Sequence, residues 1–222
     1  MESTGIAVGV LIVGLIIFFV MGAKKAEGDG KTVVLIEGSQ SGMTQSSNST
    51  TLPRSYNQAE GLTYSYSGWI LVKDFTRGYG TARRVFSKGD SPGMYLDTTS
   101  NAFLVKVATF GAVESILIPG ISAMKWVHFA IVVDQYSVDV YINGILRQHH
   151  TLAQLPKQND EPIIFGPGWD GVIGRVTYYA YSLNNEQVKK QSAEPAPDDL
   201  TLKPSAGSYF DISWYTGRFN SV

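Results

Sequence analysis

Three histidines are the side chains best suited to metal binding or acid–base chemistry in this 222-residue chain. His128 lies within the apolar run Trp126–Asp134, where a histidine is usually hydrogen-bonded inside a sheet. His149 and His150 are adjacent, so in an extended strand they face opposite sides and cannot easily share one metal ion. No serine stands in a nucleophile-elbow motif. These patterns predict neither a zinc site nor a hydrolytic triad.

The carboxylates do not form a catalytic pair in the sequence. Glycoside hydrolysis needs two carboxyl groups held on one face at a defined separation. Asp198 and Asp199 are adjacent and would point to opposite sides of an extended chain, while the glutamates stand alone. We therefore predict that the chain is not an enzyme. The isolated glutamates are Glu37, Glu60, Glu114, Glu161 and Glu186.

Two aromatic side chains lie in glycine-rich loops and are candidates for ligand or partner binding. Trp169 lies in Phe165–Gly171, and Tyr79 lies between two glycines. A loop aromatic can stack on a sugar face or on a partner side chain. The alternative for Trp169 is packing over the end of its own domain. By contrast, we expect Trp69 and Trp126, which lie within strand-like runs, to belong to the core.

Composition excludes several classes of function. The formal net charge is −1 and the basic residues are scattered, so no nucleic-acid partner is expected. The chain has no cysteine, which excludes disulfides, thiol catalysis and cysteine-ligated zinc. Many glycines, β-branched residues and aromatics favour strands joined by tight turns.

The N-terminal segment Gly5–Ala23 predicts a transmembrane anchor that contacts the lipid bilayer. Its nineteen residues carry no charge, and as a helix they would extend over about 28 Å, close to the thickness of the bilayer hydrocarbon. The rival interpretation, a signal peptide, requires a basic start that residues 1–4 lack. Lys24, Lys25 and Lys31 follow the segment, so the positive-inside rule places the C-terminal domain on the cytosolic side.

Strand patterns fill the remainder of the chain. Leu62–Val72 alternates in the period of a half-buried strand, and Asn143-Gly144 is a strong hairpin signal. Trp126–Asp134 and Ser137–Ile142 form a second predicted hairpin around Gln135-Tyr136. Strands at this spacing predict an all-β sandwich or jelly roll. Other predicted elements are strands at Thr32–Glu37, Arg84–Ser87, Gly93–Asp97, Ala102–Thr109, Val113–Ile118, Ile163–Phe165 and Gly174–Tyr181, a loop at Gly38–Thr51 with a formal glycosylation acceptor at Asn48, and a helical turn at Ser182–Val188 capped by Asn184 or Asn185.

These patterns divide the chain into an anchor (1–23), a polar stem (24–31), a β domain (32–192) and a tail (193–222). The tail is first rich in proline and then in aromatic residues, which suggests a docking segment. The alternative is that the tail folds back over an edge of its own sheet. The tail aromatics are Tyr209, Phe210, Trp214, Tyr215 and Phe219.

Four stretches resemble the laminin-G-like, concanavalin A-like jelly roll. They are Tyr64–Ile70, Arg84–Asp90, Lys125–Val133 followed by Val140–Gly144, and the closing pieces between Phe165 and Leu183. The resemblance implies two antiparallel sheets packed face to face, with strand-joining loops at the rim. Glucanases of this fold carry a Glu-x-Asp-x-x-Glu strand motif, which does not occur here. Laminin-G-like domains often bind Ca²⁺ at the rim, so Asp90, Asp97 and Asp170 become metal candidates, with capping of their own turns as the alternative.

The anchor, the module and the segment Leu52–Asn57 together resemble membrane-anchored virion proteins, or minor capsid proteins, of large double-stranded DNA viruses of algae. That resemblance implies a domain between the internal viral membrane and the capsid. The leading hypothesis is therefore a structural protein that docks on neighbouring proteins such as capsid subunits. The alternatives are a membrane-tethered lectin that binds a glycan at the rim and a degenerate glycoside hydrolase.

Overall fold

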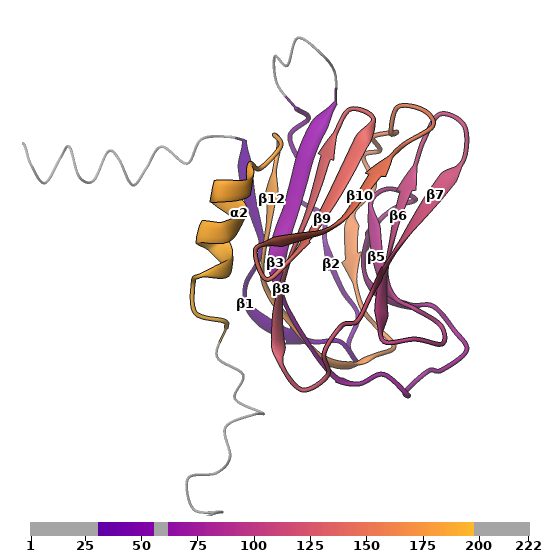
Figure 1. Ribbon diagram of the computed structural model, residues 1–222, viewed down its shortest axis with the longest axis vertical. Coiled ribbons are helices and arrows are strands. Elements are labelled where there is room, and N and C mark those ends of the chain that lie inside the picture. Colours follow the sequence, from indigo (N-terminus) through magenta and orange to yellow (C-terminus); the bar gives the residue numbers. More distant parts are fainter. Residues whose placement is uncertain (1–30, 56–61, 198–222) are drawn as a thin grey trace, which may run out of the picture.

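Strand-forming runs dominate the computed structural model, which describes residues 31–55 and 62–197. They form two six-stranded antiparallel sheets packed face to face (Figure 1), so the predicted all-β, concanavalin A-like architecture is confirmed. In spatial order, sheet A contains β1 (Thr32–Ser41), β12 (Asp170–Tyr179), β3 (Thr63–Asp74), β8 (Trp126–Asp134), β9 (Ser137–Ile142) and β10 (Ile145–Thr151). Sheet B contains β2 (Ser46–Asn48), β11 (Ile163–Phe165), β4 (Arg83–Lys88), β5 (Gly93–Leu96), β6 (Ala102–Ala108) and β7 (Val113–Pro119).

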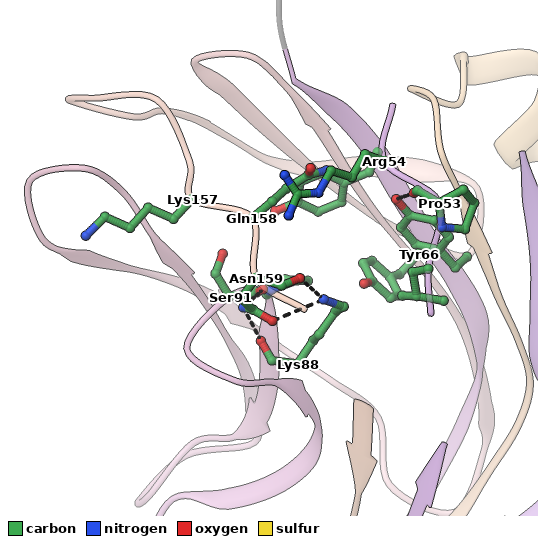
Figure 2. A pocket seen from close by; sticks show the side chains of 12 residues that line it. Pro53, Arg54, Tyr66, Lys88, Ser91, Lys157, Gln158 and Asn159 are labelled. Carbon is green, nitrogen blue, oxygen red and sulfur yellow. Dashed lines mark hydrogen bonds between the residues drawn. The ribbon is translucent and has the colours of Figure 1, made fainter. Parts of the chain in front are cut away.

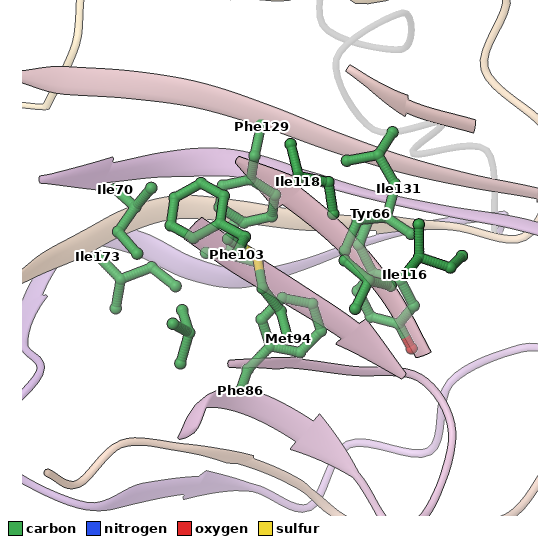
Figure 3. Close-up of a cluster of buried hydrophobic side chains, with 14 of the residues drawn as sticks. Tyr66, Ile70, Phe86, Met94, Phe103, Ile116, Ile118, Phe129, Ile131 and Ile173 are labelled. Carbon is green, nitrogen blue, oxygen red and sulfur yellow. The ribbon is translucent and has the colours of Figure 1, made fainter. Parts of the chain in front are cut away.

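The core lies between the sheets because side chains alternate along each strand. Tyr66 and Ile70 of β3, with Phe129 of β8, point inward and are buried against Phe86 of β4 (Figure 3). The ring centroids of Tyr66 and Phe86 lie 5.4 Å apart, and those of Phe86 and Phe129 lie 6.1 Å apart. Each fully buried large apolar side chain contributes roughly 1.5–3 kcal/mol, so this layer is the main source of stability.

Helix α2 (Asn185–Ser192) packs on the outer face of sheet A (Figure 1). Its Val188 is buried against outward-facing residues of β8 and β9, among them Val132 and Tyr141. Asn184 is the N-cap: its side chain accepts a hydrogen bond from the backbone N–H of Gln187, whose side chain accepts one from Asn184 N–H. The predicted helical turn is therefore confirmed and extends to Ser192.

Both predicted hairpins are confirmed. The Gln135-Tyr136 turn joins β8 to β9, and the Asn143-Gly144 turn joins β9 to β10. Asn143 and Gly144 have φ values of 50° and 76°, the left-handed conformation that a type I′ hairpin turn requires at both positions.

The segment predicted as a Ser/Thr-rich loop is partly strand. β1 continues to Ser41, and Ser46–Asn48 forms the short edge strand β2 against β11. Asn48 is part of this edge: its Nδ2 donates to Leu35 O at 3.3 Å, and its Oδ1 accepts from Thr50 N at 2.9 Å. β12 also begins earlier than expected, at Asp170, inside the predicted glycine-rich loop.

The two ends of the sandwich carry different loops. Lys31 lies at one end, where its carbonyl oxygen accepts from Ala180 N at 2.7 Å beyond the end of β12. The Gln135-Tyr136 turn lies at this end too, since Gln135 N donates to Leu62 O just before β3, and the start of β3 pairs with the end of β12. We call this the entry end, and the opposite end, with the loop at residues 75–82, the far end.

Within residues 31–55 and 62–197, no helix is long and apolar enough to cross a membrane. The predicted anchor Gly5–Ala23, most of the stem, and the tail aromatics Tyr209, Phe210, Trp214, Tyr215 and Phe219 lie outside the described residues.

Candidate functional site

A groove of about 240 Å³ lies on the outer face of sheet A, beside helix α2. Alternation along β3 forms its floor, because Tyr66 and Ile70 turn into the core and Ser67 and Trp69 therefore turn outward. Trp69 pairs in register with His128 of β8, which brings both rings to the groove. The remaining lining residues are Val34, Ile36, Glu37, Gly68, Arg175, Thr177, Tyr179, Gln191 and Glu194.

His128 is held in the floor of the groove and is 1% exposed. Its Nε2 lies 3.0 Å from Ser67 Oγ, a hydrogen bond whose direction depends on the imidazole tautomer. Burial lowers the pKa of His128 to about 4, because the charged form would lose its hydration. The ring is therefore neutral at pH 7, and the predicted hydrogen-bonded sheet histidine is confirmed.

Trp69 forms a wall of the groove and is only half-buried. Its ring packs edge-on against His128, with 5.2 Å between centroids. The prediction that Trp69 and Trp126 belong to the core is wrong, because both lie on the outward-facing positions of their strands and both are half-buried. An exposed indole face on a sheet is a typical stacking surface for an apolar or sugar ring.

Two buried polar atoms of groove-lining residues have no hydrogen-bond partner in the described part of the chain: one is a ring nitrogen that accepts or donates according to its tautomer, and the other is an amide oxygen that only accepts. They are His128 Nδ1 and Gln191 Oε1. Gln191 is itself positioned by its Nε2, which donates to the hydroxyl of Tyr179 at 2.9 Å. Buried polar atoms are nearly always paired, so two such atoms on residues that line one groove make it a candidate for binding a polar group.

Two carboxylates, Glu37 and Glu194, lie at the rim of the groove and are exposed. The general acid of a glycoside hydrolase is instead kept protonated by a buried, apolar environment. The groove therefore suits binding better than hydrolysis.

Tyr79 and two of the three calcium candidates, Asp97 and Asp170, lie at the far end. Tyr79 is 65% exposed, as expected for a partner-binding residue, in a loop braced by Arg83, whose guanidinium donates to the carbonyls of Phe75 and Arg77. Asp170 pairs in register with Asp74 at the same end.

The calcium candidates do not converge. Asp97 accepts hydrogen bonds from the backbone N–H and the hydroxyl of Ser100, and these bonds lower the pKa of its carboxyl group. It therefore caps its own turn. Asp90 lies beyond Lys88 at the entry end, away from Asp97 and Asp170. Among the residues that the structure describes, no three histidine or acidic side chains gather at one point.

Trp169 is fully buried, so its expected role as a ligand-stacking residue is wrong. The indole packs against the backbone of Gly42, where an added Cβ would lie 2.3 Å from Trp169 Cε2, and against Gly171. The packing alternative holds because these two glycines leave room for the ring.

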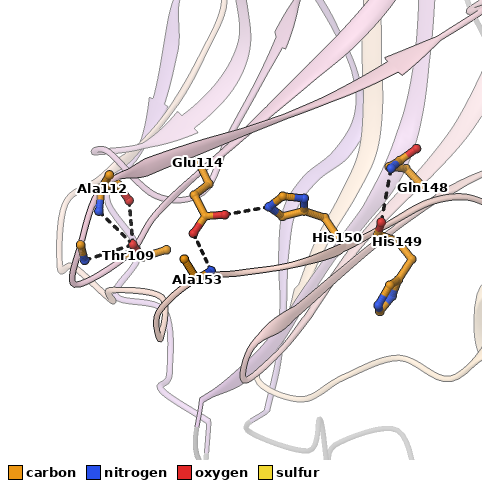
Figure 4. A network of polar contacts seen from close by, with 8 residues as sticks. Thr109, Ala112, Glu114, Gln148, His149, His150 and Ala153 are labelled. Atoms are coloured by element: carbon orange, nitrogen blue, oxygen red, sulfur yellow. Dashed lines mark hydrogen bonds and ion pairs between the residues drawn. The ribbon is translucent and has the colours of Figure 1, made fainter.

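His149 and His150 pair with different carboxylates, as their opposite orientation predicts. His149 Nδ1 lies 2.5 Å from Asp139 on β9. His150 Nε2 lies 2.7 Å from Glu114 on β7 (Figure 4). Glu114 also accepts from Ala153 N at 2.9 Å. The Glu114–His150 pair joins β7 to β10, which lie side by side at one flank of the sandwich, whereas the His149–Asp139 pair joins β10 to β9.

A second, much smaller cavity lies at the entry end (Figure 2). Its volume of about 20 Å³ is that of one water molecule, and the Lys88 ammonium at its wall donates to the carbonyl and side-chain oxygens of Asn159. Tyr178 donates to Pro53 O at 2.7 Å, and burial raises the pKa of its hydroxyl to about 12. The cavity is too small for a ligand.

Comparison with known proteins agrees with this architecture. The receptor-binding domain of botulinum neurotoxin D superposes with a TM-score of 0.57 at 14% identity, covering 72% of this chain and 46% of that chain. The binding domain of Paraclostridial Mosquitocidal Protein 1 gives a TM-score of 0.53 at 20% identity, with coverage of 72% and 46%. The ligand-binding domain of botulinum neurotoxin serotype D in complex with N-acetylneuraminic acid gives 0.55 at 14% identity, with coverage of 73% and 50%.

This chain spans about half the length of those proteins, and at such identities the likeness shows the fold alone. A comparison with curated protein sequences finds no match. The profile of the concanavalin A-like lectin/glucanases superfamily, however, matches residues 43–189, which is more than half of the chain. The chain therefore belongs to the concanavalin A-like lectin/glucanases superfamily.

Proposed function

We propose that this chain is a non-enzymatic binding module, tethered to a membrane by Gly5–Ala23, that takes a sugar unit of a glycan in the Trp69 groove. The observation that carries the proposal is a half-exposed indole beside two buried polar atoms without partners, His128 Nδ1 and Gln191 Oε1. An aromatic face with a few convergent polar groups is the usual composition of a small-molecule site. The structural neighbours include a toxin domain in complex with N-acetylneuraminic acid, which agrees with this ligand class.

The size of the groove restricts the ligand. About 240 Å³ lies just below the roughly 300–1,000 Å³ of typical ligand pockets, so the groove suits one ring rather than an extended chain. The hydrogen-bonding atoms of His128 and Ser67 at its floor are neutral, which suits the hydroxyl and amide groups of a sugar. The groove lies on the outer face of sheet A, whereas the sequence predicted a binding site in the strand-joining loops at the rim of the sandwich.

A glycan array probed with the detergent-solubilised, full-length chain tests this function. We expect binding to a subset of glycans, and a loss of about five- to thirtyfold in affinity for Trp69→Ala, since stacking on one aromatic ring contributes on the order of 1–2 kcal/mol. Trp126→Ala is the matched control, because Trp126 is also half-buried on β8 but does not line the groove. Equal binding by wild type and Trp69→Ala would contradict the proposal.

A second candidate function is docking on a neighbouring protein, and the flank formed by β7 and β10 favours it. This flank exposes four large apolar side chains: Val113 (53%), Leu117 (47%), Ile145 (65%) and Leu146 (46%). Exposed apolar residues along one flank are typical of protein–protein contacts. For a domain on the cytosolic side of a viral internal membrane, the neighbour would be a capsid protein.

Membrane topology separates the two candidates, because most glycans lie on the face opposite to the cytosol. Protease protection of the intact chain in sealed vesicles would locate the domain. A protected, lumenal domain favours the glycan-binding function. A cytosolic domain that crosslinks to capsid subunits through a photoreactive group at Ile145, but not at Tyr79, favours docking.

A further inference from the structure

The entry end of the sandwich exposes two aromatic rings that contribute little to the core. Phe110, in the turn between β6 and β7, is 67% exposed, and Tyr136, in the turn between β8 and β9, is 48% exposed. Phe110 belongs to the sheet B side and Tyr136 to the sheet A side, so the two rings come from different sheets. Burial in the fold explains neither of them.

The short segment at residues 152–155 connects these two turns through backbone hydrogen bonds. Leu152 N donates to Tyr136 O at 2.6 Å, and Phe110 N donates to Leu155 O at 3.0 Å. Both rings line one open hollow of about 420 Å³, together with Ala153, Gln154 and Leu155. The two exposed rings therefore border the same hollow at this end of the sandwich.

A cation borders this surface. Lys157 Nζ lies 5.7 Å from the centroid of the Phe110 ring, and the residue is exposed. Aromatic rings beside a lysine are the side chains found at the boundary between lipid headgroups and hydrocarbon, where the ring enters the apolar layer and the ammonium stays among the phosphates.

The chain also enters the domain at this end. Lys31 immediately precedes β1, and only residues 24–31 separate the domain from Gly5–Ala23. Eight residues extend over at most about 28 Å, so a tether of this length holds the entry end, rather than the far end, close to the bilayer.

We infer that the entry end rests on the lipid surface, with Phe110 and Tyr136 inserted at the headgroup level. This inference rests on the membrane tether of the proposed function, and it adds a second contact between the chain and the lipid. It also fixes how the domain is presented: the far end, with Tyr79, points away from the membrane.

Single-cysteine labelling of the full-length chain tests the inference, because the natural chain has no cysteine. Phe110→Cys, Tyr136→Cys and Tyr79→Cys would each carry one fluorophore, in vesicles of phosphatidylcholine and phosphatidylserine with a nitroxide on the headgroup. Tyr79 is the matched control, since it is an aromatic residue of almost the same exposure at the far end. We expect quenching at positions 110 and 136 to be several-fold stronger than at 79. Equal quenching at the three positions would overturn the inference.

Alkaline carbonate extraction of the same vesicles separates this result from a failure of the tether. Chain that stays in the vesicles but shows no preferential quenching at positions 110 and 136 keeps the tether and refutes the orientation. Chain that is extracted refutes the tether, and the inference fails with it.

Discussion

A buried, neutral histidine makes the stability of this domain depend on pH. Because burial depresses the pKa of His128 to about 4, the unfolded chain binds more protons than the folded chain between that value and the ordinary value of about 6.5. Stability therefore rises with pH through this window and is lost on acidification. From pH 7 to pH 5 we expect the wild type to lose about 2 kcal/mol more free energy of unfolding than His128→Gln, as measured by urea denaturation.

The comparison of slopes isolates the histidine, because His128→Gln changes the stability at every pH but removes only this titration. If the free energies of unfolding of wild type and His128→Gln changed in parallel with pH, the pKa of His128 would not be lowered by folding.

Gly42 gives a second prediction at the scale of single residues. An added Cβ would lie 2.3 Å from the Trp169 ring, so Gly42→Ala forces the buried indole to shift. We expect it to lower the free energy of unfolding by about 1–3 kcal/mol, the usual cost of overpacking a core. Gly38→Ala, at a position with no atom within 4 Å of the added Cβ, is the control and should cost far less. A stable Gly42→Ala domain with an unshifted tryptophan spectrum would contradict the packing.

The roles of the tryptophans show where sequence reasoning succeeds and where it fails. The alternation of side chains along Leu62–Val72 is enough to predict that Trp69 faces outward, since Tyr66 and Ile70 take the inward positions. Trp169 could not be assigned in this way. Its burial depends on Gly42, which is distant in sequence, and no local pattern reports such a contact.

At the scale of elements, the adjacent asparagines before α2 offer a matched pair. Asn184 caps the helix through a reciprocal bond with Gln187, whereas Asn185 is the first helical residue and is exposed. We expect Asn184→Ala to cost about 1 kcal/mol of stability, because a backbone N–H of the first turn loses its acceptor, and Asn185→Ala to be neutral or slightly stabilising. Thermal unfolding of both variants checks this, and the reverse order of stability would show that the cap is misassigned.

Elements with a strong period were predicted well, and elements without one were missed. Trp126–Asp134 and Ser137–Ile142 form strands with the predicted bounds, because both are rich in apolar and β-branched residues and a tight turn joins them. β2 was not predicted, because Ser46–Asn48 shows no alternation of apolar and polar residues. It is a strand only because β11 pairs with it.

At the scale of the whole molecule, the Glu114–His150 pair joins the two sheets at their open flank. The hydrogen bond from His150, assisted by the one from Ala153 N, lowers the pKa of Glu114. A carboxyl group with a lowered pKa stabilises the fold above its unfolded value of about 4.3, and this contribution is lost as the pH falls through the folded value. Glu114→Gln should therefore be less stable than wild type at pH 7, with a flatter loss of stability between pH 5 and pH 3.

Urea denaturation across this pH range measures the effect. If Glu114→Gln and wild type lose stability in parallel, the pair does not join the sheets in solution.

The fold class could be predicted from the sequence, but the groove could not. Strand patterns and the resemblance to a jelly roll were enough to predict two antiparallel sheets. The groove requires the order of strands in sheet A, which brings β3 beside β8, and the docking of α2, which places Gln191 at its edge. Neither the strand order of sheet A nor the docking of α2 can be predicted from a short stretch of sequence.

The strand order also has a consequence for biosynthesis. Among the strands of the described residues, β1 pairs only with β12 and β2 pairs only with β11, so the first two of these strands to leave the ribosome wait for the last two. At about 5–20 residues per second, translation from Ser41 to Tyr179 takes on the order of ten seconds. During that time β1 and β2 of the nascent domain have no partner strands, so neither sheet is complete. A message truncated before the codon for Ile163 would lack β11 and β12 and would leave both sheets permanently incomplete.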